Sequence, residues 1–164
     1  MSWGQILFGF SGRINRGKYW FGVVFWMLAY LVAWIVVFAV IGSRAPDFSS
    51  DNVGAIIAAL GMGLLILVVV TIPMLISGFA LGIKRLHDRN KSGWWVLLFY
   101  FGPGVLGAIA ATTANEVAVL ALNLASFVVA IWGLVELGFL RGTVGSNQYG
   151  PDLLEPAPPP MPAR

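Results

Sequence analysis

The sequence predicts an all-α integral membrane protein, built as a bundle of four transmembrane helices with both termini in the cytoplasm. Three observations lead to this prediction. Of the 164 residues, 59% are hydrophobic and only 10% are charged, whereas soluble domains carry about 25% charged residues. The chain contains four long apolar stretches, and most of its lysines and arginines gather in alternate segments between them. Because so few charges cannot cover the surface of a water-soluble fold, we expect most of the chain to be buried in lipid.

Each span is assigned on its length. A helix needs about 20 apolar residues to cross a hydrocarbon core of roughly 30 Å, because each residue rises about 1.5 Å. The first stretch, Tyr19 to Ile41, exceeds the roughly 7–15 apolar residues of a cleaved signal peptide, so we expect it to remain in the protein. The spans that we assign cover residues 19–41, 53–83, 94–111 and 117–140.

Prolines fall in two of these spans. The second span is longer than a bilayer requires, and Pro73 within it predicts a kink, with tilt absorbing the surplus length. The third span is short, and the sequence Phe-Gly-Pro-Gly at residues 101–104 interrupts it. Because proline breaks the hydrogen bonding of a helix, we expect a break there.

The distribution of cations predicts the orientation, because cytoplasmic loops of membrane proteins are enriched in lysine and arginine. Three cations precede the first span, four lie in the loop after the second, and Arg141 and Arg164 follow the fourth. The other side carries Arg44 beside Asp47 and Asp51 in the first loop, and only the acidic Glu116 in the turn after the third span. Both termini and the loop after residue 83 are therefore predicted to be cytoplasmic.

The two ends of the chain differ from the membrane domain at residues 19–140. Residues 1–18 are predicted to form a cytoplasmic segment, in which the apolar side chains of Trp3, Ile6, Leu7 and Phe10 recur at helical spacing. That spacing fits a short interfacial helix, and a partly ordered lead-in is the alternative. Residues 141–164 contain a segment rich in glycine and asparagine, followed by a proline-rich tail that we expect to be disordered.

The residue inventory excludes several classes of chemistry. The chain has no cysteine, which excludes disulfides, thiolate nucleophiles and cysteine-based zinc sites. His87 is the only histidine, and its neighbour Asp88 points about 100° away from it on a helix, so the two are not a natural chelating pair. We therefore predict no metal and no cofactor. The net charge of +3 is spread over short loops, which argues against a nucleic-acid partner.

The densest polar segment is Lys-Arg-Leu-His-Asp-Arg-Asn-Lys-Ser-Gly-Trp-Trp at residues 84–95. If the second helix continues for one turn beyond the membrane, Asp88 can pair with Lys84 four residues earlier or with Arg85 three residues earlier. The tryptophans that end the segment are predicted interfacial anchors, because indole rings favour the head-group region. These anchors are Trp94 and Trp95.

Glu136 is the charged exception in the fourth span. A carboxylate at the bilayer centre costs about 2.5–3.5 kcal/mol, so we expect it to lie near the cytoplasmic edge and to pair with a cation. A polar cavity mouth or a proton-linked site around Glu136 is the functional alternative. The cations expected nearby are Arg13, Arg16, Lys84 and Arg85.

Three polar segments on the predicted cytoplasmic side share a wider pattern. They read FSGRINRGKYW at residues 10–20, KRLHDRNKSGWW at residues 84–95 and GTVGSNQYGPD at residues 142–152. Together they resemble a bacterial inner-membrane family, domain of unknown function 805, typified by YhaH-like proteins. The resemblance falls on Phe10, Gly12, Arg13 and Arg16, on Lys84, Arg85, His87, Asp88, Ser92, Gly93, Trp94 and Trp95, and on Gly145, Asn147, Tyr149, Gly150, Pro151 and Asp152.

This resemblance implies a four-helix integral membrane protein of the bacterial inner membrane. It implies no particular activity, because the family has no settled biochemical function. Members of the family usually carry proline directly after the acidic residue that corresponds to Asp152, whereas this chain has Leu153. That departure affects only the tail.

Two sets of candidate site residues follow from these segments. Arginine forks match phosphate oxygens, and each cation near an anionic leaflet adds roughly 1 kcal/mol of attraction. An anion or lipid head-group site is therefore predicted, with diffuse attraction to the leaflet as the alternative. Its candidates are Arg13, Arg16, Lys84, Arg85 and Arg89. A polar cytoplasmic cluster is predicted from His87, Asp88, Glu136, Asn147, Tyr149 and Asp152.

The leading functional hypothesis is a non-enzymatic scaffold or accessory factor whose basic cytoplasmic face binds anionic lipid or a partner protein. Small residues four apart, such as Gly78 and Gly82, permit close helix contacts within the chain or in a homo-oligomer. A small transporter or channel built around Glu136 is the second hypothesis. A lipid-acting enzyme that uses His87 and Asp88 is the third.

Overall fold

The computed structural model describes residues 2–44, 52–152 and 154. Within these ranges the chain is helical up to residue 139, apart from short connections, and an irregular segment follows η2. The predicted disordered tail from residue 155 onward, Arg164 within it, and Leu153 lie outside the described residues. The all-helical architecture predicted from the sequence is confirmed.

The described chain contains five α-helices and one π-helix. Three helical stretches are long and apolar enough to cross a membrane, namely Arg16–Ser43, Val53–Asp88 and Glu116–Phe139, whereas α4 is a shorter apolar helix of 17 residues. The elements are α1 (Trp3–Phe8), α2 (Arg16–Arg44), α3 (Val53–Asp88), α4 (Trp95–Ala111), α5 (Glu116–Leu134) and the π-helix η2 (Val135–Phe139).

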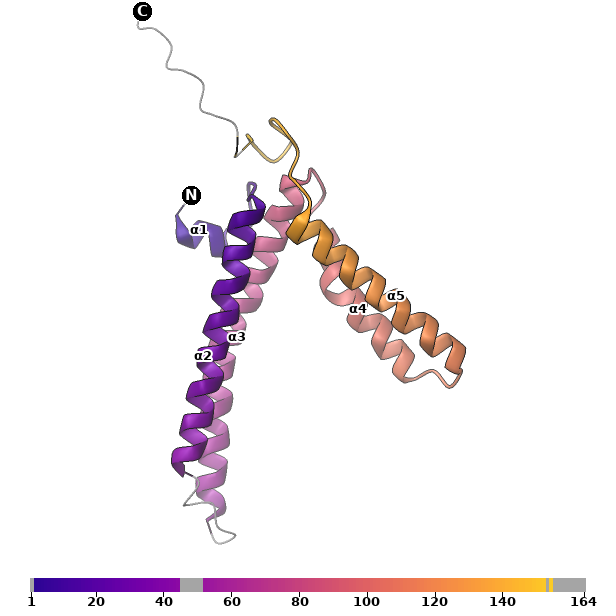
Figure 1. The fold of residues 1–164 in the computed structure, drawn as a ribbon. Coiled ribbons are helices and arrows are strands. Elements are labelled where there is room, and N and C mark those ends of the chain that lie inside the picture. Colours follow the sequence, from indigo (N-terminus) through magenta and orange to yellow (C-terminus); the bar gives the residue numbers. More distant parts are fainter. Residues whose placement is uncertain (1, 45–51, 153, 155–164) are drawn as a thin grey trace, which may run out of the picture.

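The helices form two hairpins rather than one bundle. Helix α2 packs along α3, and α4 packs along α5; the hairpins diverge from the end that holds α1 and the segment after η2 (Figure 1). Contacts between them come from η2 against α2 and α3, and from α3 against α4. The prediction of a single four-helix bundle is wrong in this respect. Hydropathy identifies apolar helices, but it does not determine which of them pack along their whole length.

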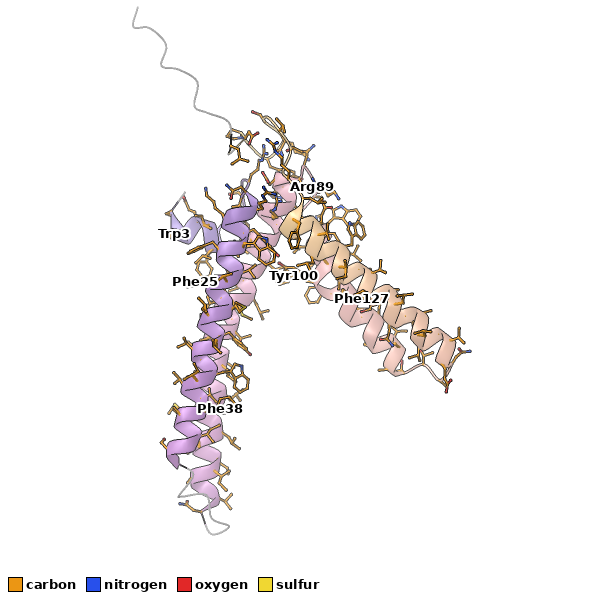
Figure 2. The ribbon with its side chains drawn as sticks, viewed as in Figure 1. Trp3, Phe25, Phe38, Arg89, Tyr100 and Phe127 are labelled. Carbon is orange, nitrogen blue, oxygen red and sulfur yellow. The ribbon has the colours of Figure 1, made fainter. Side chains whose placement is uncertain are left out.

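The sides of both hairpins present apolar side chains to their surroundings. Phe38 on α2 is 66% exposed and lies far from the end where the hairpins meet, and Phe127, about midway along the other hairpin, is 63% exposed (Figure 2). Exposed apolar surface of this extent is unfavourable in water, whereas lipid tails are as apolar as the side chains themselves. These are the surfaces of a membrane protein.

The break predicted in the third span is absent, whereas the second helix continues past its span, as the pairing of Arg85 with Asp88 required. Helix α4 runs through Pro103 without a break, and α3 continues beyond Ile83 to Asp88. Proline is tolerated in membrane helices where neighbouring helices and serine side chains supply compensating contacts. Here the Ser126 hydroxyl of α5 donates to the carbonyl of Pro103 at 2.9 Å. The last turn of α3 is buried, with Lys84, Arg85 and Asp88 among its buried residues.

A glycine sets the close approach between α3 and α4. A Cβ added at Gly82 would lie 2.8 Å from both Val96 Cγ2 and Tyr100 Oη. The Tyr100 hydroxyl donates to the carbonyl of Gly78, one turn earlier, at 2.9 Å. At Gly78 itself nothing lies within 4 Å of an added Cβ. Of this small-residue pair, Gly82 is the member at the contact between helices.

We expect Gly82→Ala to lower the free energy of unfolding by about 1–3 kcal/mol, because the added methyl group forces Val96 and Tyr100 away from α3. Gly78→Ala is the matched control, and it is expected to be neutral or to stabilise the helix by up to about 1 kcal/mol. Thermal unfolding in detergent micelles, followed by circular dichroism, measures both. Equal losses in the two variants would contradict the close approach at Gly82.

Candidate functional site

A cluster of buried charges closes the end of the molecule where the hairpins meet. Arg89 lies at this end, among other nitrogen-bearing side chains (Figure 2). Charged groups in such a position must be paired or hydrogen-bonded, because burying a bare charge is costly. The members of this charged cluster are each at most 5% exposed, and they are Arg13, Lys84, Arg85, Asp88 and Glu136.

Asp88, the last residue of α3, lies between two arginines. Its Oδ1 accepts a hydrogen bond from Nε of Arg13 at 3.1 Å, and its Oδ2 accepts one from Nη1 of Arg85 at 2.5 Å. The predicted pairing of Arg85 with Asp88 is confirmed, whereas Lys84 has other partners. One carboxylate therefore joins the segment before α2 to the end of α3.

Arg13 places three further donors on the backbone of the segment after η2. Nη2 donates to the carbonyl of Thr143 at 2.7 Å, and Nη1 donates to those of Gly145 at 2.9 Å and Gly150 at 3.2 Å. Both glycines have positive φ, +76° and +140°, which residues with a side chain rarely adopt. Their turns direct three carbonyls toward one guanidinium group, so the glycines of this segment serve the site.

Arg85 reaches the π-helix in the same way. Its Nε donates to the carbonyl of Leu137 at 2.8 Å, and its Nη2 donates to the carbonyl of Leu140. The wider π-turn changes which carbonyls are bonded within the helix, and such turns occur frequently at functional sites. Trp20 of α2 takes a third carbonyl, that of Gly138, at 2.9 Å. The irregular end of the last helix is thus held by side chains from α2 and α3.

Lys84 has no carboxylate partner among the described residues. Its Nζ donates to the carbonyls of Gln5 at 2.7 Å and Ile6 at 2.5 Å, near the C-terminal end of α1. Cations are favourable at helix C-termini, where the last carbonyls lack partners within the helix. Lys84 therefore fixes α1 against α3, and it is fully buried.

Glu136 of η2 pairs with two cations of the turn after α3. Its Oε1 lies 3.0 Å from Nε of Arg89 and 3.0 Å from Nζ of Lys91. The prediction that Arg13, Arg16, Lys84 or Arg85 would neutralise Glu136 is therefore wrong. Arg13 and Arg85 are bonded to Asp88 and to backbone carbonyls, and Lys84 is bonded to backbone carbonyls alone. The turn after α3 brings Arg89 and Lys91 to η2 instead.

His87 lies on the other side of the end of α3. Its Nδ1 is 3.2 Å from the carbonyl of Gly12, and its ring stacks on Tyr149 with centroids 3.8 Å apart and an angle of 5° between the planes. The Asn147 side chain donates to the carbonyl of His87 at 2.9 Å and to the hydroxyl of Thr143 at 2.8 Å. The predicted polar residues 87, 147 and 149 are thus neighbours in the structure.

Asp152 ends the described polar segment. Its carboxylate accepts hydrogen bonds from the backbone N–H groups of Leu154 and Gly145, each at 2.9 Å. These N–H groups lower the pKa of the Asp152 carboxyl below its usual value, because they stabilise the charged form. The carboxylate therefore stays ionised at neutral pH and holds the segment in its turned shape.

A cavity of about 200 Å³ lies beside the charged cluster. Three arginines line it, of which Arg13 is buried, whereas Arg16 and Arg141 are exposed. Within residues 2–44, 52–152 and 154, no hydrogen bond or ion pair engages the guanidinium group of Arg16 or Arg141. The other lining residues are Asn15, Asp88, Gly142, Thr143, Asp152 and Leu154.

The structure divides the predicted anion-binding residues. Arg13 and Arg16 line the cavity, Lys84 and Arg85 are buried against other partners, and Arg89 is paired with Glu136. Sequence reasoning missed Arg141 as a site residue. Arg141 directly follows the fourth apolar stretch, on the side predicted to be cytoplasmic, and this position could have identified it.

The two predicted anchors lie at the start of α4. Trp94 is 78% exposed, and Trp95 is 39% exposed, with its ring against Trp132 at a centroid distance of 5.5 Å. Lys91 Nζ lies 5.8 Å from the centroid of the Trp95 ring, within reach of a cation–π contact. The indole rings thus flank the turn that carries the partners of Glu136.

These features define a helical membrane protein in which three polar segments, far apart in the sequence, close one end around a single carboxylate. The chain belongs to the family described as protein of unknown function (DUF805), whose model matches residues 7–151. The resemblance predicted from the sequence is confirmed.

Two relatives from Escherichia coli (strain K12) are similar along most of their length. "Inner membrane protein YhaI" is 32% identical over 148 residues, which cover 88% of this chain and 85% of the relative. "Uncharacterized protein YiiR" is 28% identical over 148 residues, which cover 90% of this chain and 88% of the relative. No solved structure matches the chain.

Replacing Asp88 tests the charged cluster. Asp88→Asn leaves Arg13 and Arg85 buried without a counter-ion, so we expect a loss of about 3–5 kcal/mol in the free energy of unfolding. Glu116→Gln, at an exposed residue in the first turn of α5, is the control and is expected to cost at most about 1 kcal/mol. Thermal unfolding in micelles and trypsin digestion of the segment after η2 report the difference. A loss of stability in Asp88→Asn no larger than that in Glu116→Gln would contradict a structural role for the ion pairs of Asp88 with Arg13 and Arg85.

Proposed function

We propose that this protein is a non-enzymatic accessory protein of the bacterial inner membrane that binds an anionic lipid head group at its cytoplasmic face. The observation that carries the proposal is the cavity lined by Arg13, Arg16 and Arg141. The name of the relative YhaI, an inner membrane protein, supports the proposed location in the inner membrane.

The proposed topology has four spans, with both termini cytoplasmic. Helix α4 has 17 residues and is therefore about 25 Å long, close to the roughly 30 Å of the hydrocarbon core. Helix α5 with η2 forms a stretch of 24 residues beside it. The cations before α2, after α3 and after η2 then lie together on one side, as the positive-inside rule requires.

The charges around the cavity favour an anion. Asp88 is already bound by two arginines, and Asp152 by two backbone N–H groups. Arg16 and Arg141 remain to meet a ligand, and guanidinium groups bind phosphate oxygens in paired contacts. Because the cavity lies beside the predicted membrane surface, a lipid phosphate is the anion at highest local concentration.

The folded structure gives less support to the transporter and enzyme hypotheses than the sequence did. Helix α4 has no break at Pro103, and Glu136 is 3% exposed and held by two cations, so neither feature favours a transport path. Asp88 is enclosed by two guanidinium groups, so it is not available as a catalytic base for His87. We therefore propose neither transport nor catalysis.

The topology is tested by single cysteines, since the chain has none of its own. In spheroplasts, Thr113→Cys between α4 and α5 and Ser43→Cys at the end of α2 are expected to react with a membrane-impermeant maleimide. Asn90→Cys after α3 is expected to react only after permeabilisation, because it lies on the cytoplasmic side. Labelling of Asn90→Cys in intact spheroplasts, or protection of Thr113→Cys, would contradict four spans with cytoplasmic termini.

The lipid site is tested by replacing the two exposed arginines together. Arg16→Ala with Arg141→Ala is expected to reduce retention of phosphatidylglycerol over phosphatidylcholine about tenfold or more, because each arginine contributes charge-assisted hydrogen bonds to the phosphate. Native mass spectrometry of protein released from mixed micelles measures the retained lipids. Lys18→Ala, a cation of the same segment that does not line the cavity, should retain the wild-type preference. Unchanged retention in the double variant, or an equal loss in Lys18→Ala, would overturn the proposal.

A further inference from the structure

A second cavity, of about 350 Å³, lies where the end of α3 faces the start of α4. One end of it is polar, with His87, Ser92 and Tyr149, and the other end is apolar. Phe79 lies about two turns of α3 before His87, so the apolar end is roughly 12 Å from the polar end along the axis of α3. The apolar lining is completed by Ile83 of α3 and by Trp94, Val96 and Leu97.

His87 presents a hydrogen-bond acceptor at the polar end. Its Nδ1 is 3.2 Å from the carbonyl of Gly12, and a carbonyl only accepts, so Nδ1 carries the proton and Nε2 of the neutral ring is the acceptor. Among the described residues no donor reaches Nε2. A Cβ added at Gly93 would lie 3.5 Å from Nε2, so the bare glycine leaves space beside this atom.

Ser92 adds a donor to the same end. Its hydroxyl oxygen accepts from the backbone N–H of Trp94 at 3.4 Å, and within the described ranges no acceptor engages its hydrogen. Tyr149 stacks on the imidazole and fixes its plane. The polar end therefore offers an acceptor at His87 and a donor at Ser92, a combination that a hydroxyl group satisfies at once.

This cavity differs in charge from the cavity that Arg13, Arg16 and Arg141 line. No lysine, arginine, aspartate or glutamate is among its lining residues, and a phosphate, which carries acceptors only, would face the acceptor Nε2. The apolar end is accessible from the side, since Leu97 is 40% exposed. A hydrocarbon chain in this end would remove apolar surface from contact with water and head groups.

We propose that the cavity between α3 and α4 binds a neutral amphipathic lipid whose head group carries a free hydroxyl. The hydroxyl donates to Nε2 of His87 and accepts from Ser92, while the chain lies against Phe79, Val96 and Leu97. A diacylglycerol and a quinol share this chemistry. This site is separate from the lipid phosphate site proposed above and does not depend on it.

The single histidine makes the site directly observable. In protein labelled with nitrogen-15 histidine, in micelles at about pH 8 where imidazole is neutral, dioctanoylglycerol is expected to move the Nε2 signal saturably. The same lipid with its hydroxyl acetylated, and dioctanoyl phosphatidic acid, should bind at least tenfold more weakly. Saturation by decylubiquinol but not by dioctanoylglycerol would support the proposal with a quinol as the source.

Two neighbouring leucines of α4 provide the matched variants. Leu97 and Leu98 have similar exposure, 40% and 38%, but only Leu97 lines the cavity. Leu97→Trp fills the apolar end and is expected to weaken binding at least tenfold, whereas Leu98→Trp is expected to bind as wild type does. The proposal is overturned if neither hydroxyl lipid shifts the signal, if the acetylated lipid or the phosphatidic acid shifts it equally well, or if Leu97→Trp binds like Leu98→Trp.

Discussion

The structure depends on one carboxylate held between two guanidinium groups. Asp88 binds Arg13 and Arg85 where all three side chains are almost fully buried. Ion pairs in such places are favourable only when every remaining donor finds an acceptor, because desolvation otherwise exceeds the Coulomb attraction. The chain supplies such acceptors from the backbone carbonyls of two segments, those near Gly145 and near Leu137. These hydrogen bonds join the segment before α2, the π-helix η2 and the segment after it to the end of α3.

The same arrangement explains why the two hairpins are joined at one end and separate at the other. Along most of their length the helices meet only apolar surroundings, and lipid competes equally with leucine for such faces. Polar contacts have no such competitor in hydrocarbon, so they determine where the hairpins hold together. The cluster at the end of α3 and the approach at Gly82 lie at this junction. Helix packing and charge pairing thus combine at this end of the molecule, and both proposed lipid sites border it.

The sequence predicts most of the helices, but it does not predict most of the ion pairs and hydrogen bonds between distant segments. Apolar runs predict the helices, and the spacing of Arg85 and Asp88 predicts their pair, because both signals are local. The partners of Glu136 come from a turn whose path depends on how α4 leaves α3, so spacing does not predict them. The acceptors of Arg13 are backbone carbonyls, and every residue has one, so no side-chain pattern marks those that are used. The role of Arg141 in the basic cavity depends on the same folded path.

The distance along the chain between Arg13 and its acceptors has a consequence for biosynthesis. The guanidinium group and the carbonyl of Thr143 are separated by 130 positions, and the ribosome delivers the N-terminal part first. Until the last helix has been made, Arg13 must be solvated by water or head groups, even if the first two membrane helices already lie side by side. The end of the molecule that holds the charged cluster can therefore close only after the segment around Thr143 has left the ribosome.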